Sequence, residues 1–241
     1  MTPEELVSAT AAPVNSLGAI YYFHPSTLAR GKELGLDGMR FYLIGRAGVL
    51  GDVAAPVVTS AFGYFAPAVI AKLWDTAKQT IAPHDAARAA LECNAAIGRD
   101  KLGDVAGLDA FCAAAEQVVS KVNPSALSLY AGVAAEPLPE DLPARAMQLA
   151  VVHRELRGSV HLAAIIAAGI HPGVAHAIRR PNDVETFGWP ADIAISDQDR
   201  TRLSAVDTVT NERSADHYRS LSDSQRADFV AGVNAMSAAF E

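Results

Sequence analysis

The sequence predicts an all-α fold, a multi-helix bundle with a degenerate winged-helix-like part at its C-terminal end. Alanine, the best helix former, supplies 47 of the 241 residues. Apolar residues recur at helical i, i+3, i+4 spacing, whereas strand-like alternation is confined to Asp192–Ile195. Half of the residues are hydrophobic and 20% are charged, which fits a folded globular chain and excludes wholesale disorder.

Capping residues and helix breakers divide the first half of the chain into helices. Thr2-Pro3-Glu4-Glu5 can form a capping box and starts a helix toward Tyr22, with a kink at Pro13. A break at His24-Pro25-Ser26 starts a short helix that ends at Gly35. The further helices expected here begin at Asp37, lie within Val53–Ala71 as a pair joined near Phe65-Ala66, and cover Pro83–Gly103 and Asp104–Val122.

The second half is expected to contain a long helix, a boundary and two C-terminal helices. The long helix covers Pro143–Ala168 and is followed by breaks at Gly169 and Pro172-Gly173. Arg180–Asp183 marks the boundary between a helical ligand-binding-like body, residues 1–180, and a C-terminal part, residues 181–241. In that part we expect a short hairpin remnant near residues 186–196 and helices over Ser196–Tyr218 and Ser222–Phe240.

Charge and composition narrow the function classes. With a net charge of −7 and a pI near 5.5, the chain lacks the positive electrostatic field that supports nonspecific nucleic-acid binding. Val53–Ala71 is uncharged over 19 residues, but its prolines and glycine would leave backbone groups unpaired in lipid, so we expect buried helices and no membrane partner. No signal peptide is apparent, and Cys93 and Cys112 are expected as free thiols of a cytoplasmic protein.

The most informative polar segment lies on the long helix. His153, Arg157 and His161 follow one another at four-residue spacing and therefore share one face of a continuous helix. The residues after His161 are core-like, so this polar face runs into apolar surroundings. A cation there must be paired or must meet an anionic ligand. The alternative is an ordinary helix surface with a hydrogen-bonded histidine and a local pair between Glu155 and a neighbouring arginine.

A second polar residue stands alone in an apolar segment. Arg46 is the only charged residue between Phe41 and Asp52, and a glycine-rich turn follows it. Glycines allow a backbone to approach a ligand closely. An arginine in the last helical turn can equally stabilise the C-terminal end of the helix dipole. Both interpretations stay open, because no strand precedes the segment as a dinucleotide fingerprint would require.

The seven histidines raise the question of a metal or heme site. None belongs to an HExxH pattern and no CxxC pattern occurs, so the signal for a metal site is weak, no metal ligand is assigned and no cofactor is named. A heme needs only one or two axial ligands, for which His161 and His153 are the candidates.

The charged segment Asp197–Arg219 is explained either by a solvated helix face or by a dimer-forming helix.

Four motifs carry a resemblance to a known family. They are Tyr21-Tyr22-Phe23, Tyr42–Gly51, Phe65–Val69 and the pair Arg154–Gly158 with His161–Ala164. With these motifs, which spread over residues 20–170, the chain resembles an actinobacterial all-helical family of MarR-like helix-turn-helix proteins (EvbL-type). The resemblance implies a helical ligand-binding-like body followed by a small winged-helix region.

The last part of the chain departs from that pattern. Only six residues separate Trp189 from Ser196, whereas a recognition helix of three turns needs on the order of eleven. This shortness and the acidic pI argue against DNA as a partner.

Three functional hypotheses follow from these residues. The first is a small-molecule-binding protein on a MarR-like regulator scaffold, which senses or processes an anionic or apolar ligand in an interior pocket. The pocket is lined by Arg46, Arg157, Tyr22, Tyr42 and His153, with His161 as hydrogen-bond donor or general acid/base. The second is a dimeric DNA-binding transcriptional regulator, for which Arg179-Arg180 and Asn182 are the nearby base-contacting candidates. The third is a heme or metal-dependent enzyme that uses His161 or His153. We prefer the first, and the sequence leaves open whether the protein is a catalyst.

Overall fold

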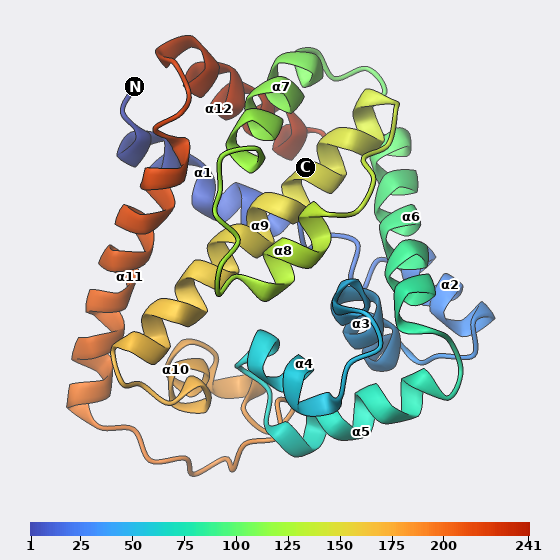
Figure 1. The fold of residues 1–241 in the computed structure, drawn as a ribbon, viewed down its shortest axis with the longest axis vertical. Helices are drawn as coiled ribbons and strands as arrows, with labels where there is room; N and C mark the ends of the chain where they lie inside the picture. Colours follow the sequence, from blue (N-terminus) through green and yellow to red (C-terminus); the bar gives the residue numbers. More distant parts are fainter.

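The computed structural model describes all residues 1–241 as an assembly of helices without a single strand. The all-α prediction is therefore confirmed. Figure 1 shows the helices arranged around one long central helix. The elements are α1 (Pro3–Leu17), α2 (Pro25–Glu33), α3 (Gly38–Ala47), η1 (Gly48–Leu50), α4 (Ala55–Phe62), α5 (Pro67–Lys78), α6 (Pro83–Lys101), α7 (Leu108–Val119), α8 (Ser128–Ala134), α9 (Leu142–Ala167), α10 (Pro172–Arg179), η2 (Pro181–Asp183), α11 (Asp197–Tyr218) and α12 (Asp223–Ala238).

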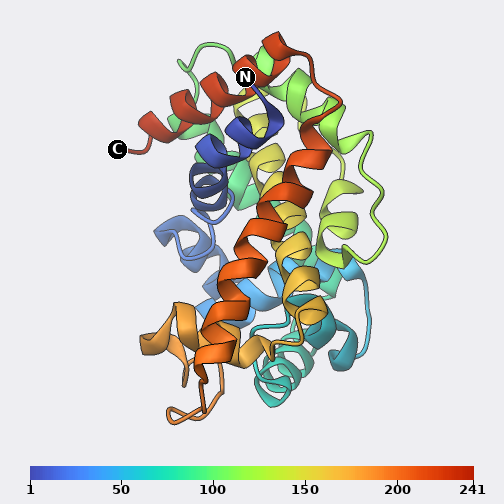
Figure 2. The same ribbon diagram turned by 90° about the vertical axis from the view of Figure 1, so that its left-hand side faces the viewer.

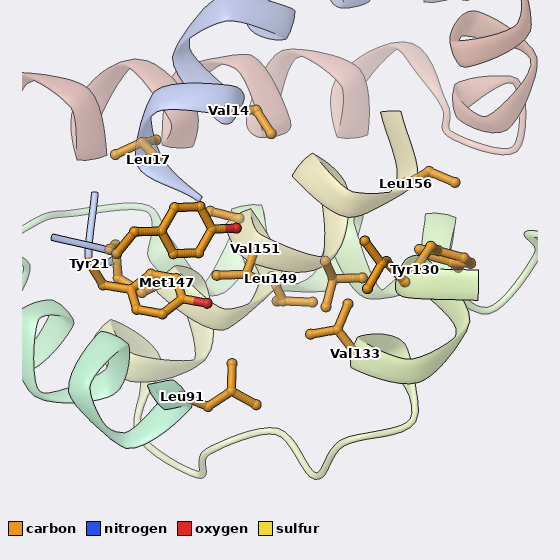
Figure 3. Packing of buried hydrophobic residues seen from close by; sticks show 14 of the residues in the cluster. Val14, Leu17, Tyr21, Leu91, Tyr130, Val133, Met147, Leu149, Val151 and Leu156 are labelled. Carbon is orange, nitrogen blue, oxygen red and sulfur yellow. The ribbon is translucent and has the colours of Figure 1, made fainter. Parts of the chain in front are cut away.

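The expected long helix is α9, and it organises the core. It packs against α1, α6, α7, α8 and α11. Its hydrophobic residues point in all directions, as expected for a helix that is surrounded by other helices. In Figure 3, Met147, Leu149 and Val151 of α9 lie between Leu17 of α1 and Val133 of α8. Burial of this helix is what joins the bundle into a single main core.

Two helices are shorter than the sequence predicts, for local reasons. α1 ends at Leu17, where Gly18 forms the C-cap. A Cβ at Gly18 would meet the Ala150 carbonyl and the Arg154 side chain of α9, so glycine permits the close approach of the two helices. α7 begins at Leu108 and not at Asp104, because Gly107 adopts φ +79° and closes the preceding turn.

The C-terminal helices α11 and α12 pack onto the rest of the bundle. α11 lies beside α9, and α12 packs against α1 and α7 (Figure 2). Their apolar residues, among them Tyr218 and Phe229, belong to the same core as α9. The division at residue 180 stays a prediction.

The hairpin expected near residues 186–196 is wrong, because turns and a loop without strand pairing fill this segment. A wing is a β-hairpin, so this part contains none.

Two helices joined by a short turn lie earlier in the chain. α4 and α5 pack together and are joined by the four residues Gly63–Ala66, which confirms the predicted joint. Gly63 adopts φ +66° in the turn, and a Cβ there would overlap the side chain of Leu162 on α9. The turn is therefore fixed against the central helix.

No single helix is long and apolar enough to span a membrane, although two sharply bent helix pairs have sufficient length and apolar composition.

The close packing of η1 on α6 can be tested by substitution at Gly48. A Cβ at Gly48 would overlap the carbonyl oxygen of Pro83, a backbone atom that cannot move aside. We expect Gly48→Ala to lower the free energy of unfolding by about 3 kcal/mol in urea titrations, as overpacking does. Gly103→Ala is the control, because a Cβ there would lie 3.7 Å from its nearest neighbour, the Arg99 carbonyl oxygen, and the backbone at Gly103 has no positive φ. It should change the free energy of unfolding by no more than about 1 kcal/mol. Equal losses in the two variants would contradict the packing.

Candidate functional site

A buried carboxylate on α9 joins the central helix to α3. Glu155 is 2% exposed, and Arg46 of α3 binds it with two hydrogen bonds, from Nε at 2.8 Å and from Nη2 at 2.9 Å. Arg154 donates from Nη1 to the same carboxylate at 2.7 Å. Arg46 therefore neither stabilises the end of its own helix nor stays free for a ligand. Its charge is neutralised by a residue 109 positions away.

Two arginines outweigh the cost of burying this carboxylate. Burial alone would raise the pKa of Glu155, but the charges of Arg46 and Arg154 and the hydrogen bonds to the carboxylate lower it to about 2. The same pairing raises the pKa of Arg46 against the opposing effect of its burial. The group is thus a charged ion pair at neutral pH, with one positive charge in excess.

Tyr22 and Tyr42 both belong to this ionic cluster. The Tyr22 hydroxyl donates to Glu155 at 3.1 Å, and the Tyr42 hydroxyl accepts from Arg46 at 3.1 Å. Their rings are 5.0 Å apart in an edge-to-face arrangement. Tyr22 is buried behind the ion pair, so of the two tyrosines only Tyr42 borders the large cavity described next.

A cavity of about 430 Å³ lies beside the cluster, along one side of α9. Residues from α1, α3, α4, α8, α10 and α11 complete its walls. Part of the lining is aromatic and apolar, because Phe65 contacts both Phe62 and Phe187 and the wall also includes Tyr64 and Leu162. The lining is also cationic, because Arg46, Arg154, Arg157 and Arg179 border the cavity against the carboxylates Glu155 and Asp207. Its volume is in the range of sites for small organic ligands.

Arg157 is the arginine of this cavity that has no carboxylate partner. Arg46 and Arg154 bind Glu155, and Arg179 binds Asp207 of α11. Arg157 donates from Nη2 to the amide oxygen of Asn211 at 2.9 Å, and its Nε is buried without a partner. An unmatched cation beside a cavity favours an anionic ligand.

His161 lies one helical turn after Arg157 and is held by α11. Its Nδ1 is 2.9 Å from the hydroxyl oxygen of Thr210. Burial and the nearby charge of Arg157 lower the pKa of His161, so the neutral ring dominates at pH 7. The expected common face of Arg157 and His161 is thus present, and both side chains line the cavity.

His153 borders the same cavity but has both ring nitrogens engaged. Nδ1 is 2.9 Å from the Tyr218 hydroxyl, and Nε2 is 3.2 Å from the Ala115 carbonyl oxygen. Because a carbonyl only accepts, Nε2 carries the proton and Nδ1 accepts from the tyrosine. Burial lowers the pKa of His153 to about 4. No nitrogen is left for a metal or heme iron, so that hypothesis would depend on His161 alone.

The structure adds functional candidates that sequence reasoning missed. Glu155 was expected at most as a local partner of a neighbouring arginine, but it is the centre of the ion-pair cluster. Thr210 and Asp207 belong to the charged segment for which the sequence predicts a solvated or dimer-forming helix. In the structure Thr210 contacts His161 and Asp207 binds Arg179, both of which line the cavity. His176, buried and stacked on Phe187 with its Nε2 unpartnered, also lines the cavity. The signal for Glu155, Thr210 and Asp207 is tertiary, because their partners Arg46, His161 and Arg179 come from other helices.

The basic residues considered for DNA recognition are largely occupied. Arg179 is paired with Asp207, and Arg180 lies 3.8 Å from Asp183. On α5, the second helix of the α4–α5 pair, the exposed charged side chains are Lys72 and Asp75, one of each sign. This helix face offers few of the arginine and amide side chains that read base edges.

Comparison with known proteins gives one match. A family model described as a helix-turn-helix family matches residues 7–187, which is 181 of the 241 residues. The match includes the α4–α5 pair and most of the cavity wall and leaves out α11 and α12. No curated protein and no solved structure matches the chain.

The ion pair predicts a specific pH dependence of stability. The folded pKa of Glu155 is about 2, below its ordinary value of 4.5. Its contribution, of about 3 kcal/mol, is therefore complete above pH 4.5 and is lost as the pH falls toward 2. We expect Glu155→Gln to destabilise the protein at pH 7, because Arg46 loses its charge partner. The difference from wild type should shrink between pH 4.5 and 2.5 in urea titrations.

The exposed Glu212 provides the matched control for this titration. Glu212→Gln should change the free energy of unfolding little at any of these pH values. A difference between wild type and Glu155→Gln that stays constant with pH would contradict the charged pair.

Proposed function

The chain belongs to the helix-turn-helix family whose model it matches, and on that premise we propose that it binds a small anionic molecule in the cavity beside α9. The observation that carries this proposal is Arg157, a cavity-lining arginine with no carboxylate partner. The finer assignment to the MarR-like, EvbL-type proteins is part of the proposal and is supported by the four sequence motifs.

The charge balance of the cavity supports this function. Five arginines border it against two carboxylates, so the walls carry excess positive charge while the histidines are neutral. The cavity is large enough for a drug-sized molecule, and its aromatic part suits an apolar body. Should the bound molecule be transformed, His161 is the residue placed to move a proton. Sensing without chemistry requires the same residues.

A second candidate is a dimeric DNA-binding regulator, which the family match favours. The α4–α5 pair would supply the DNA-binding helices. This pair also borders the cavity, because Phe62, Tyr64 and Phe65 belong to α4 and the turn after it. The backbone N–H of Ala66 donates to the Phe187 carbonyl, and the Trp189 indole donates to the Tyr64 carbonyl. A regulator would therefore use the cavity as its sensor, and the two candidates are compatible.

Gly158 offers a test of the cavity that leaves the fold intact. It lies on α9 at the cavity wall, and a Cβ there would meet no atom within 4 Å. We expect Gly158→Leu to fill the space and abolish retention of a small molecule, measured by native mass spectrometry of protein purified from cells. Gly158→Ala is the control and should retain it. Both variants should be more stable than wild type by up to about 1 kcal/mol, since glycine is a poor helix former.

A retained mass that is equal in wild type and Gly158→Leu would place the ligand elsewhere and contradict the proposal. The stability of the two variants, measured in the same preparations, shows whether the comparison is between folded proteins.

The DNA-binding candidate has its own test. A regulator that contacts phosphates should bind duplex DNA with an affinity that falls at least tenfold between roughly 50 and 200 mM salt. Fluorescence anisotropy with a mixed-sequence duplex measures this slope. Lys72→Gln on the exposed face of α5 should weaken binding, whereas Lys101→Gln at the end of α6 should not. Absence of binding at the lowest salt would remove this candidate.

A further inference from the structure

The hydrogen bonds of His161 fix which of its ring nitrogens carries the proton. The Thr210 hydroxyl has one hydrogen, and the 2.7 Å contact to the Val206 carbonyl uses it, because a carbonyl cannot donate. The Thr210 oxygen must then accept from Nδ1–H of His161 at 2.9 Å. In the neutral ring, Nε2 is therefore the unprotonated nitrogen, a hydrogen-bond acceptor without a protein partner.

The hydrogen bonds of Arg157 likewise show which of its N–H groups have no partner in the protein. Nη2 uses one of its two hydrogens on Asn211, and Nη1 has no protein partner. Both hydrogens of Nη1 and the remaining hydrogen of Nη2 are thus available to bind a carboxylate. Arg157 and His161 are four residues apart on α9, so their side chains leave the helix as neighbours.

We propose that the ligand is a small hydroxy acid, whose carboxylate binds Arg157 and whose adjacent hydroxyl donates to Nε2 of His161. This inference rests on the proposed function and specifies the chemical class of its ligand. The neighbouring positions of the two side chains require the carboxylate and the hydroxyl to be close together on the ligand. The apolar remainder of the molecule extends toward Phe62, Phe65 and Leu162 in the aromatic part of the cavity.

The surroundings of His161 exclude two other ligand classes. A protonated amine beside the carboxylate would bring a positive charge next to Arg157 and Arg179, with Asp207 already bound to Arg179. An acid without a donor would leave Nε2 unsatisfied in a partly buried site, which costs binding free energy. Burial and Arg157 also lower the pKa of His161, which keeps Nε2 free of a proton at neutral pH.

Three acids of one skeleton test the proposal by calorimetry at pH 7. Mandelate carries the hydroxyl, phenylacetate lacks it, and α-methoxyphenylacetate keeps the oxygen without its hydrogen. We expect mandelate to bind wild type at least about tenfold more tightly than either analogue, as one buried hydrogen bond predicts. Arg157→Gln should weaken all three acids. His161→Phe should remove the preference for mandelate while leaving its residual affinity equal to that of phenylacetate.

Thr210→Val separates positioning from direct contact. Thr210 is fully buried and touches no ligand in this arrangement, but its oxygen sets the tautomer of His161. The variant should reduce the preference for mandelate, and ¹⁵N chemical shifts of the His161 ring should show loss of the Nδ1–H form. Ser237→Ala, which removes another hydroxyl that donates to a backbone carbonyl on α12, is the control and should change neither.

Two results would overturn the hydroxy-acid inference. One is equal affinity for the three acids, or binding of none of them up to roughly 10 mM, which is weaker than any specific site. The other is a wild-type His161 ring with its proton on Nε2. Neither result removes the proposed function, which fails only when Gly158→Leu retains the cellular ligand as wild type does.

Discussion

The pairing of Glu155 with Arg46 is the interaction on which the arrangement of the site depends. A carboxylate at 2% exposure is tolerated in this bundle only because arginines from two helices neutralise it. The bidentate geometry fixes the distance and orientation between α3 and α9. Tyr22 and Tyr42 take up remaining hydrogen-bonding capacity of the pair, so the cluster forms a rigid wall on one side of the cavity.

Arg46 and Arg154 are both paired with Glu155, so the cavity cation without a carboxylate partner is Arg157, further along α9. This position matters because α11 approaches α9 there and supplies Asn211 and Thr210 as partners of Arg157 and His161. α11 lies outside the part of the chain that the family model matches. The polar part of the cavity thus joins residues of the family core to residues of the C-terminal helices. The proposed ligand site accordingly depends on both parts.

Local sequence patterns were enough to predict most of the helices, but not which distant side chains pair with one another in the site. Thr2 forms the expected capping box, and α11 and α12 start at the expected residues Ser196 and Ser222, which the structure shows to be their N-caps. The N-cap of α2 is His24 and not the expected Ser26. The helical periodicity that placed Arg157 beside His161 is also local and is confirmed. The partner of Arg46 could not be predicted, because Glu155 is adjacent only after α3 folds against α9. The hairpin near residue 190 was expected from one short alternating run, which tertiary contacts of Trp189 and Phe187 override.

The central claim, that the cavity beside α9 binds an acid through Arg157, is tested most directly by crystals grown with 4-bromomandelate. The anomalous signal of bromine locates the apolar end of the ligand, and the electron density locates its carboxylate. We expect bromine near Phe65 and Phe187 and the carboxylate on the guanidinium of Arg157. Bromine outside the cavity, or a carboxylate that displaces Glu155 from Arg46, would contradict it.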